Sequence, residues 1–269
     1  MRAKAVLREA LFAIAPGAML ARAHRRFGAS ARREEAMIRA LSRGSRTAID
    51  VGANLGYFSR VLSETAARVV AFEPVPALAA LLRRHLSPRV EVVEAAASDG
   101  SRAMIELYVP LSHGDPIYTE ASAEHRMGEM RPGAGLTVEA ASCSIDSLAL
   151  GDVDFIKIDV EGHEEGVLAG ATTTLAECRP ALWIECEERH NPGGPERLFA
   201  ALERLGYDGW FVEEGRLAPV AEFRADLQSE ERRGQGPLWY VNNFAFVHRT
   251  RQGFDLLAAL AAAGEIEDA

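Results

Sequence analysis

In this 269-residue chain, the residues whose types and spacing best suit a chemical task form a glycine-rich turn, together with an acidic residue that follows the next apolar run. The turn runs from Asp50 through Gly52, Asn54 and Gly56, between an apolar run and a helical pattern. Glycines let the backbone approach a ligand closely, and the following helix offers unpaired N–H groups and its positive dipole end. Glu73 ends the next apolar run, about 20 residues on, where an acid meets ribose hydroxyls in βαβ nucleotide sites. The pattern predicts a site for a nucleotide-bearing cofactor.

The form of the turn separates two cofactors. A dinucleotide fingerprint G-x-G-x-x-G needs glycine at positions 54 and 57, where this chain has Asn54 and Tyr57, so NAD is disfavoured. An acid two residues before the first glycine, followed by G-x-N-x-G, is similar to the first motif of methyltransferases that use S-adenosylmethionine (SAM). Asparagine in the middle is physically reasonable, because it tolerates positive φ better than other non-glycine residues. A glycine-rich turn without a ligand is the alternative, and Glu73 argues against it.

A second group of residues suited to chemistry lies downstream. Asp159, Glu161 and His163 follow an apolar run, and Glu185 ends the next one. We expect them at the carboxyl edge of a parallel sheet, where open α/β folds bind ligands. Methyl transfer to a hydroxyl profits from a base that takes the proton, so we predict His163 as that base, with Asp159 or Glu185 to orient it. The alternatives are that His163 caps a helix and that the acids stabilise its first turn.

The same four side chains also suit a hard metal ion. Asp159, Glu161, His163 and Glu185 would offer oxygen and nitrogen ligands to Mg²⁺, which can acidify a substrate hydroxyl. The alternative is that these carboxylates accept hydrogen bonds from loop N–H groups. We therefore assign no residue to a metal, and Mg²⁺ stays open beside SAM as a second cofactor.

The string DFIKIDVEGHE at 154–164 makes the comparison specific. Together with DVGANLGYFS at 50–59 and FEPVP at 72–76, it resembles the FkbM family of SAM-dependent methyltransferases over about residues 47–248. The resemblance implies an α/β, Rossmann-like class I methyltransferase fold with a mostly parallel seven-stranded sheet and an antiparallel edge. It also implies an O-methyltransferase that acts on a hydroxyl of a sugar or secondary metabolite.

The resemblance assigns a role to each cofactor residue. The acid before the turn would contact the methionine end, directly or through water, and Glu73 would accept hydrogen bonds from both ribose hydroxyls. Phe72 or Pro74 would flank the adenine, whose amino group would meet Asp99, although Asp99 also suits a plain turn. The predicted cofactor-binding set is Asp50, Gly52, Asn54, Gly56, Phe72, Glu73, Pro74, Ser98, Asp99 and Asp159.

Acceptor contacts are expected from the long segment 110–136, which interrupts the regular alternation of strands and helices. It is polar and suits a hydroxylated molecule better than a lipid, and long loops in compact domains are usually functional or disordered. The predicted acceptor-binding residues are His113, Tyr118, Arg126, Glu161 and His190.

Charge divides the chain into two parts. Residues 1–46 hold eleven Lys or Arg against three acids, although the whole chain has a net charge of −9. The chain after residue 46 is therefore strongly acidic, which disfavours nucleic acid as a partner. We predict a basic helical arm over 1–46 and a methyltransferase domain over 47–269. The arm is expected to pack on the domain or mediate self-association, and a secretory signal or a membrane-surface helix are its alternatives.

No run approaches the roughly 20 apolar residues of a transmembrane helix. The three cysteines show no C-x-x-C pair, which indicates reduced thiols and a cytoplasmic protein. Alternating apolar runs and helical periods predict βαβ units. Strands are expected over 47–51, 68–73, 90–94, 104–109, 137–143, 153–158, 181–185, 209–213 and 239–248, and helices over 57–66, 76–86, 195–205 and 254–263.

Other functions stay open at this point. Nitrogen could be the methyl acceptor, since the fold does not determine the acceptor atom. A metal-dependent hydrolase could use the carboxylates and His163, but it would leave the glycine turn and Glu73 without a purpose. A non-catalytic scaffold would be expected to lack some motif residues, and the strongest positions are all present.

Overall fold

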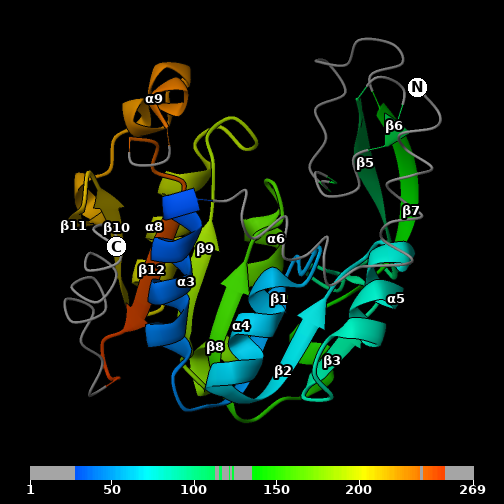
Figure 1. Ribbon diagram of the computed structural model, residues 1–269. Coiled ribbons are helices and arrows are strands. Elements are labelled where there is room, and N and C mark those ends of the chain that lie inside the picture. Colours follow the sequence, from blue (N-terminus) through cyan, green and yellow to red (C-terminus); the bar gives the residue numbers. More distant parts are fainter. Residues whose placement is uncertain are drawn as a thin grey trace.

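The computed structural model describes residues 28–112, 115–116, 121, 123, 135–236 and 239–251. The described part is an α/β domain built on an eight-stranded sheet with the order β11-β10-β12-β9-β8-β1-β2-β3 (Figure 1). The arm before Gly28, the expected C-terminal helix and the acceptor candidates His113, Tyr118 and Arg126 lie outside the described residues.

The main sheet is mostly parallel, as predicted. Its parallel strands are β1 (Ser45–Val51), β2 (Ala66–Phe72), β3 (Val90–Val93), β8 (Val153–Ile158) and β9 (Ala181–Glu185). Beside β9 lies β12 (Asn243–His248), which is antiparallel to β9 and to β10 (Tyr207–Glu213). The sheet has one strand more than predicted, because β10 turns back through Glu214 and Gly215 into β11 (Arg216–Pro219).

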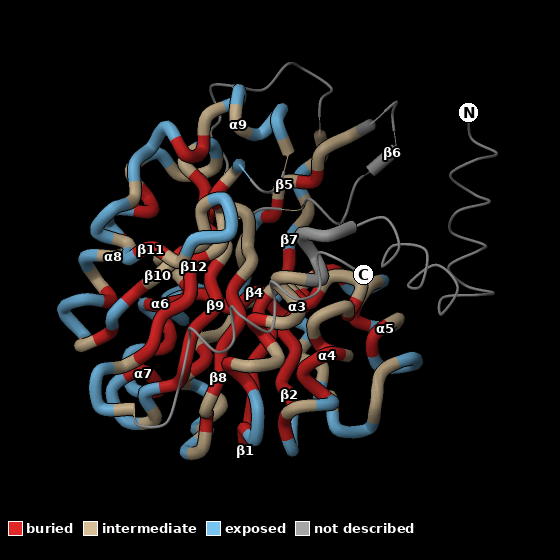
Figure 2. The backbone as a smooth tube through the Cα atoms, turned by 60° about the vertical axis from the view of Figure 1, so that its left-hand side comes forward, coloured by how far each residue is buried: buried red, intermediate tan, exposed pale blue. Residues whose placement is uncertain are grey.

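Helices cover both faces of the sheet (Figures 1 and 2). α3 (Gly28–Ser42) and α4 (Tyr57–Thr65) pack on one face, where Met37, Ile38 and Leu41 of α3 are buried against β8 and β9. The other face is covered by α6 (Glu164–Ala169), α7 (Thr172–Glu177) and α8 (Gly194–Arg204). α5 (Pro76–His85) contacts β3, and α9 (Glu230–Gln235) follows the short 3₁₀ segment Ala225–Gln228.

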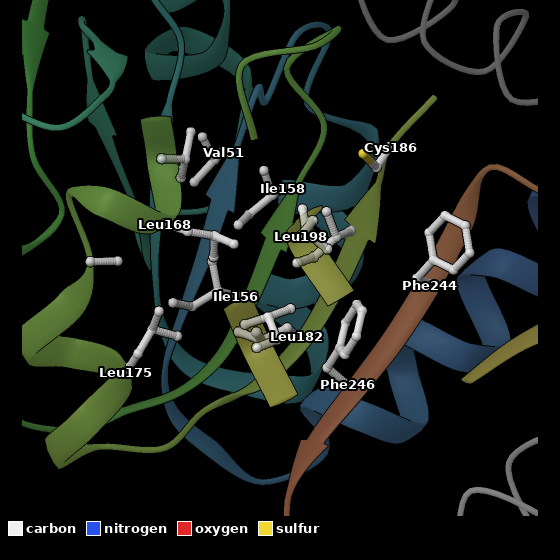
Figure 3. Packing of buried hydrophobic residues seen from close by; sticks show 14 of the residues in the cluster. Val51, Ile156, Ile158, Leu168, Leu175, Leu182, Cys186, Leu198, Phe244 and Phe246 are labelled. Atoms are coloured by element: carbon white, nitrogen blue, oxygen red, sulfur yellow. The ribbon is translucent and has the colours of Figure 1, made fainter. Parts of the chain in front are cut away.

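The central strands are buried on both faces, which explains why their sequences read as continuous apolar runs rather than alternating ones. Figure 3 shows one of these faces, where Ile156 and Ile158 of β8 pack beside Leu182 of β9 and Leu198 of α8. All four side chains are almost completely buried, and each such burial contributes roughly 1.5–3 kcal/mol. The core therefore holds the carboxyl ends of the strands rigidly in place.

A second, four-stranded sheet with the order β4-β7-β5-β6 arises where the sequence departs from the simple alternation. β5 (Met104–Ser112) and β7 (Gly135–Cys143) form an antiparallel pair that extends past α5, away from the main sheet (Figure 1). β4 (Ala96–Ala97) pairs with the end of β7, and β6 (Asp115–Pro116) with the end of β5. Parts of the predicted loop 110–136 are thus strand. Among the described residues, no helix is long and apolar enough to cross a membrane.

Candidate cofactor and acceptor site

Strand register gathers the predicted site residues at one edge of the main sheet. Asp50 of β1 lies opposite Lys157 of β8, and Lys157 lies opposite Trp183 of β9. Two residues further along β1 and β8, on the same face, come Gly52 and Asp159. At the same edge, Glu185 of β9 pairs with Asn243 of β12. The carboxyl ends of the parallel strands β1, β8 and β9 and the first residue of the antiparallel β12 thus present polar groups side by side.

The turn after β1 has the backbone geometry that its glycines and asparagine allow. Gly52, Asn54 and Gly56 have φ values of 79°, 52° and 78°, all in the left-handed region. A Cβ on Gly52 would lie 1.9 Å from the carbonyl oxygen of Asp159, so only glycine fits there. Gly56 is the N-cap of α4, which points the helix N-terminus toward the turn.

Glu73 closes this turn. Its Oε2 accepts a hydrogen bond from the Asn54 N–H at 2.7 Å, and its Oε1 accepts one from the Val75 N–H at 2.8 Å. Burial raises the pKa of Glu73 to about 7, although both N–H donors lower it. A carboxylate has about four acceptor positions, so two remain for ligand hydroxyls.

Asp50 supports the turn from beneath. Its side chain is completely buried, and Ser59 Oγ donates to its Oδ2 at 2.5 Å. Burial raises the pKa of Asp50, against the opposing effects of Lys157 and Ser59. Because the carboxylate does not reach the surface, the contact with a ligand that we expected from it would need a bridging water.

Ser98 and His163 meet on the other side of the turn. Ser98 follows β4, and its Oγ lies 2.9 Å from His163 Nε2. His163 is the N-cap residue of α6, the position expected if it caps a helix. Its side chain makes no cap hydrogen bond, however. Asp99 is exposed, and its Oδ1 accepts hydrogen bonds from the N–H and hydroxyl of Ser101, as in a turn.

The two candidates for the adenine flank differ in exposure. The Phe72 ring is completely buried in the core and offers no surface to a ligand, so it does not suit the predicted role. Pro74 is partly exposed just beyond Glu73 and remains the candidate.

The carboxylates expected to orient His163 have other partners. Lys157 Nζ donates to Asp159 Oδ2 at 3.0 Å, and Asn242 Nδ2 donates to Glu185 Oε1 at 2.7 Å. Burial raises the pKa of Glu185 well above its ordinary value, and the negative charge of Asp159 raises it further.

A second histidine lies on this side of the site. His190 Nε2 is 2.6 Å from Glu161 Oε2, and Glu161 itself has a left-handed φ of 53°. Next to them, Arg189 donates to both oxygens of the buried Glu187, at 2.7 and 2.8 Å, and the Tyr240 hydroxyl donates to Glu187 as well. Glu161 and His190, both predicted to bind the acceptor, are therefore brought together.

The structure does not gather the four residues considered for Mg²⁺. Within the described chain, the group with suitable spacing is instead Glu161, Glu187 and His190, whose nearest ligand atoms lie within 4.8 Å of one another. The Arg189 guanidinium already neutralises Glu187 and lies 3.8 Å from Glu161 Oε2. A cation thus occupies the neighbourhood, and we assign no metal to it.

Sequence reasoning missed two residues of this site. Lys157 is buried with Asp159 and Asp50 beside its ammonium, and the signal was a lone lysine inside the apolar run 153–158. Glu34 of α3 accepts a hydrogen bond from Trp183 Nε1 at 3.0 Å, and burial raises its pKa to about 7. A cavity of about 60 Å³ between α3 and the strands β9, β10 and β12 is lined in part by Glu34, Trp183, Trp210, Tyr240 and Asn243.

Comparisons with known proteins agree with this arrangement. The family model described as "Methyltransferase FkbM domain" matches residues 50–208, which is more than half of the chain and includes the turn, Glu73 and the ends of β8 and β9. No curated protein matches.

Several solved structures are similar at low identity. Methyltransferase FkbM from Methylobacillus flagellatus KT is 17% identical with a TM-score of 0.45, and the match covers 75% of this chain but only 43% of that one. A SAM-dependent methyltransferase from Aquifex aeolicus is 12% identical with a TM-score of 0.38, covering 77% of this chain and 83% of that one. A chain from the complex of the Haloferax volcanii Trm112 methyltransferase activator with a putative methyltransferase is 12% identical, with a TM-score of 0.44 and coverage of 90% and 97%.

Proposed function

Because the chain belongs to the FkbM family of methyltransferases, we propose that it is a SAM-dependent O-methyltransferase whose acceptor is a hydroxyl of a sugar or secondary metabolite. The observation that carries the cofactor part is the turn closed by Glu73, in which a buried carboxylate binds the N–H groups of Asn54 and Val75. A carboxylate held there, one strand away from a glycine turn and a helix N-terminus, is the arrangement that binds a ribose in nucleotide sites.

The residues at this edge fit SAM. Gly52 lets the turn pass tightly against the Asp159 carbonyl, where a Cβ would clash, and Glu73 keeps acceptor positions for two hydroxyls. Pro74 and Ser98 would border the adenine, with the exposed Asp99 as acceptor for its amino group. Asp50, whose carboxylate accepts a hydrogen bond from Ser59, would contact the methionine end through a bridging water.

SAM, when bound, supplies an electrophilic methyl group. The protein's task is to hold an acceptor oxygen in line with that methyl and to receive the proton that the oxygen loses. The acceptor would lie over the ends of β8, β9 and β12, where Asp159, Glu161 and Glu185 can bind its hydroxyls. These carboxylates orient the acceptor, and a neutral histidine is the group best suited to receive the proton near neutral pH.

Two histidines are candidates for that proton. His163, predicted from the sequence, is held by Ser98 at the end of β4. His190 follows β9 and lies 2.6 Å from Glu161 Oε2. His163→Gln and His190→Gln therefore separate the two: the true base loses turnover number at saturating acceptor, whereas a positioning residue mainly raises KM.

The test is transfer of labelled methyl from SAM to a panel of hydroxylated sugars and metabolites, with amines included. Label in a product stable to mild acid and base and assigned to oxygen by mass spectrometry supports the proposal. Label on nitrogen alone would replace O-methylation by N-methylation, since the fold does not determine the acceptor atom. Hydrolysis of test esters or glycosides by protein that binds no SAM would favour a metal-dependent hydrolase instead.

The proposal includes a setting and partners. SAM is a cytoplasmic cofactor and the acceptor a small hydroxylated molecule, so we propose a cytoplasmic enzyme that needs no nucleic acid. Beyond the packing of α3 on the sheet, the basic segment 1–46 is proposed to join two copies. Sedimentation of the full chain against a chain that lacks residues 1–27 and keeps α3 would test this. Activity unaffected by EDTA would exclude a need for Mg²⁺.

A further inference from the structure

Lys157 is a fully charged group in an apolar interior. Its side chain is only 2% exposed, in the middle strand of the main sheet. Burial alone lowers the pKa of a lysine, yet the pKa of Lys157 is raised, because the carboxylates of Asp159, Asp50 and Glu34 outweigh the burial. A lysine is retained in such a place only where its ammonium is paired.

The partners of Lys157 come from separate elements. Its Nζ donates to Asp159 Oδ2 at 3.0 Å and lies 3.9 Å from Asp50 Oδ1. On the α4 side it lies 5.0 Å from the centre of the Phe58 ring, a favourable distance for a cation over an aromatic face. Glu34 of α3 faces it as a third acid.

The two carboxylates that Lys157 joins belong to different halves of the site. Asp50 lies beneath the turn of the cofactor half, and its Oδ1 has no hydrogen-bond donor among the described residues. Asp159 lies at the end of β8 in the acceptor half, and its N–H donates to the Val51 carbonyl at 3.1 Å. One buried cation therefore spans the boundary between the cofactor half and the acceptor half.

We propose that Lys157 is a positioning residue of the methyltransferase, whose ammonium holds Asp50 and Asp159 in place as carboxylates and so sets the cofactor turn against the acceptor edge. The proposal rests on the proposed function. Burial raises the pKa of Asp50 and that of Glu34, and the charge of Lys157 opposes this effect. Without the lysine, these two acids would keep their protons more readily. The positively charged cofactor would then meet protonated acids at neutral pH, and its binding would recover as the pH rises.

The experiment is calorimetric binding of SAM and S-adenosylhomocysteine at pH 7 and pH 9 by the full chain. Lys157→Met keeps the unbranched side chain, one heavy atom shorter, and removes its charge. We expect Lys157→Met to bind about tenfold or more weakly than wild type at pH 7, which is the factor that corresponds to a pKa shift of one unit in an acid of the site. At pH 9 its affinity should recover. Lys157→Arg, which keeps a charge, should bind more tightly than Lys157→Met at pH 7. Arg46→Met is the matched control, because it breaks an exposed ion pair with Asp154 and should bind like wild type.

Lys157→Met can fail to fold, and a second variant covers that outcome. Lys157→Met/Asp159→Asn removes the charge of one acid together with that of the lysine. This double variant should fold. Its affinity should change less between pH 7 and pH 9 than the tenfold recovery expected for Lys157→Met.

Three results would overturn the proposal. The first is Lys157→Met with wild-type affinity at both pH values, and the second is a folded double variant with tenfold recovery between pH 7 and pH 9. The third, a folded wild-type protein that binds neither compound, would refute the proposed function as well, so the two failures can be told apart.

Discussion

Gly52→Ala probes the geometry of the cofactor turn most sharply. The new Cβ would lie 1.9 Å from the Asp159 carbonyl oxygen, whereas such contacts are essentially never under 3.0 Å, so the backbone of the turn or of the β8 end must move by more than 1 Å. The φ of 79° adds about 1–2 kcal/mol of strain for any residue with a Cβ. Overpacking costs roughly 1–3 kcal/mol more, which brings the expected loss of unfolding free energy to about 2–5 kcal/mol.

Two other glycines provide matched controls. Gly44 and Gly215 have φ values of 73° and 81°, but a Cβ at either would meet no described atom within 4 Å outside its chain neighbours. Gly44→Ala and Gly215→Ala should therefore show the strain alone, about 1–2 kcal/mol, and should bind S-adenosylhomocysteine like wild type.

Urea unfolding and calorimetry at pH 7 measure both quantities. We expect Gly52→Ala to be less stable than either control and to lose about tenfold or more in affinity, because a 1 Å misplacement in a binding site is costly. If Gly52→Ala matched Gly44→Ala in both stability and affinity, the close approach of the turn to β8 would not matter and our reasoning about the site would be wrong.

Three further predictions concern pH, a helix cap and a histidine. The pKa of Glu73 is about 7 in the folded protein and 4.5 ordinarily, so between these values the folded state keeps a proton that the unfolded chain has lost. The unfolding free energy should therefore fall as the pH rises from 4.5 to about 7. In urea unfolding, Glu73→Gln should reduce this pH dependence by roughly 1.4 kcal/mol per pH unit, and an unchanged dependence would contradict the prediction. Asp146 accepts backbone N–H bonds at the start of α7, so Asp146→Ala should lower the unfolding free energy by about 1–2 kcal/mol without changing cofactor affinity; a loss of affinity would contradict this assignment. A Cβ on Gly166 would lie 2.5 Å from the His163 ring, so Gly166→Ala should displace that imidazole and slow methyl transfer, whereas Gly234→Ala, in open space on α9, should not; equal rates would show that the position of His163 is unimportant.

The sequence allowed the main sheet and the cofactor half of the site to be predicted because both depend on local patterns. Apolar runs predicted the central strands to within about two residues, which is the usual disagreement at element ends. The turn and Glu73 lie within one βαβ unit, so their meeting follows from short-range spacing alone. The eighth strand was missed because β11, with the sequence Arg-Leu-Ala-Pro, is not an apolar run, whereas the equally short β3, Val-Glu-Val-Val, is rich in valine.

The acceptor half was harder to predict because its contacts join distant parts of the chain. Ser98 and His163 are 65 residues apart, and Asn242 and Glu185 are 57 apart, so sequence order does not indicate that they pair. Lys157 was overlooked because a lysine is ordinarily exposed, and its burial depends on acids from β1 and α3 that only the folded sheet brings near it. That Asp159 or Glu185 orients His163 stays a prediction, and each of these carboxylates also accepts a hydrogen bond from another residue, Lys157 or Asn242.

Titration of the purified protein with S-adenosylhomocysteine, by wild type and by Glu73→Ala, tests the central claim most directly. The account predicts micromolar binding by the wild type, unaffected by EDTA, and none by Glu73→Ala, with Gly44→Ala as the folded control that binds normally. A folded wild-type protein that does not bind S-adenosylhomocysteine, or a Glu73→Ala variant that binds it as tightly as the wild type, would contradict the account.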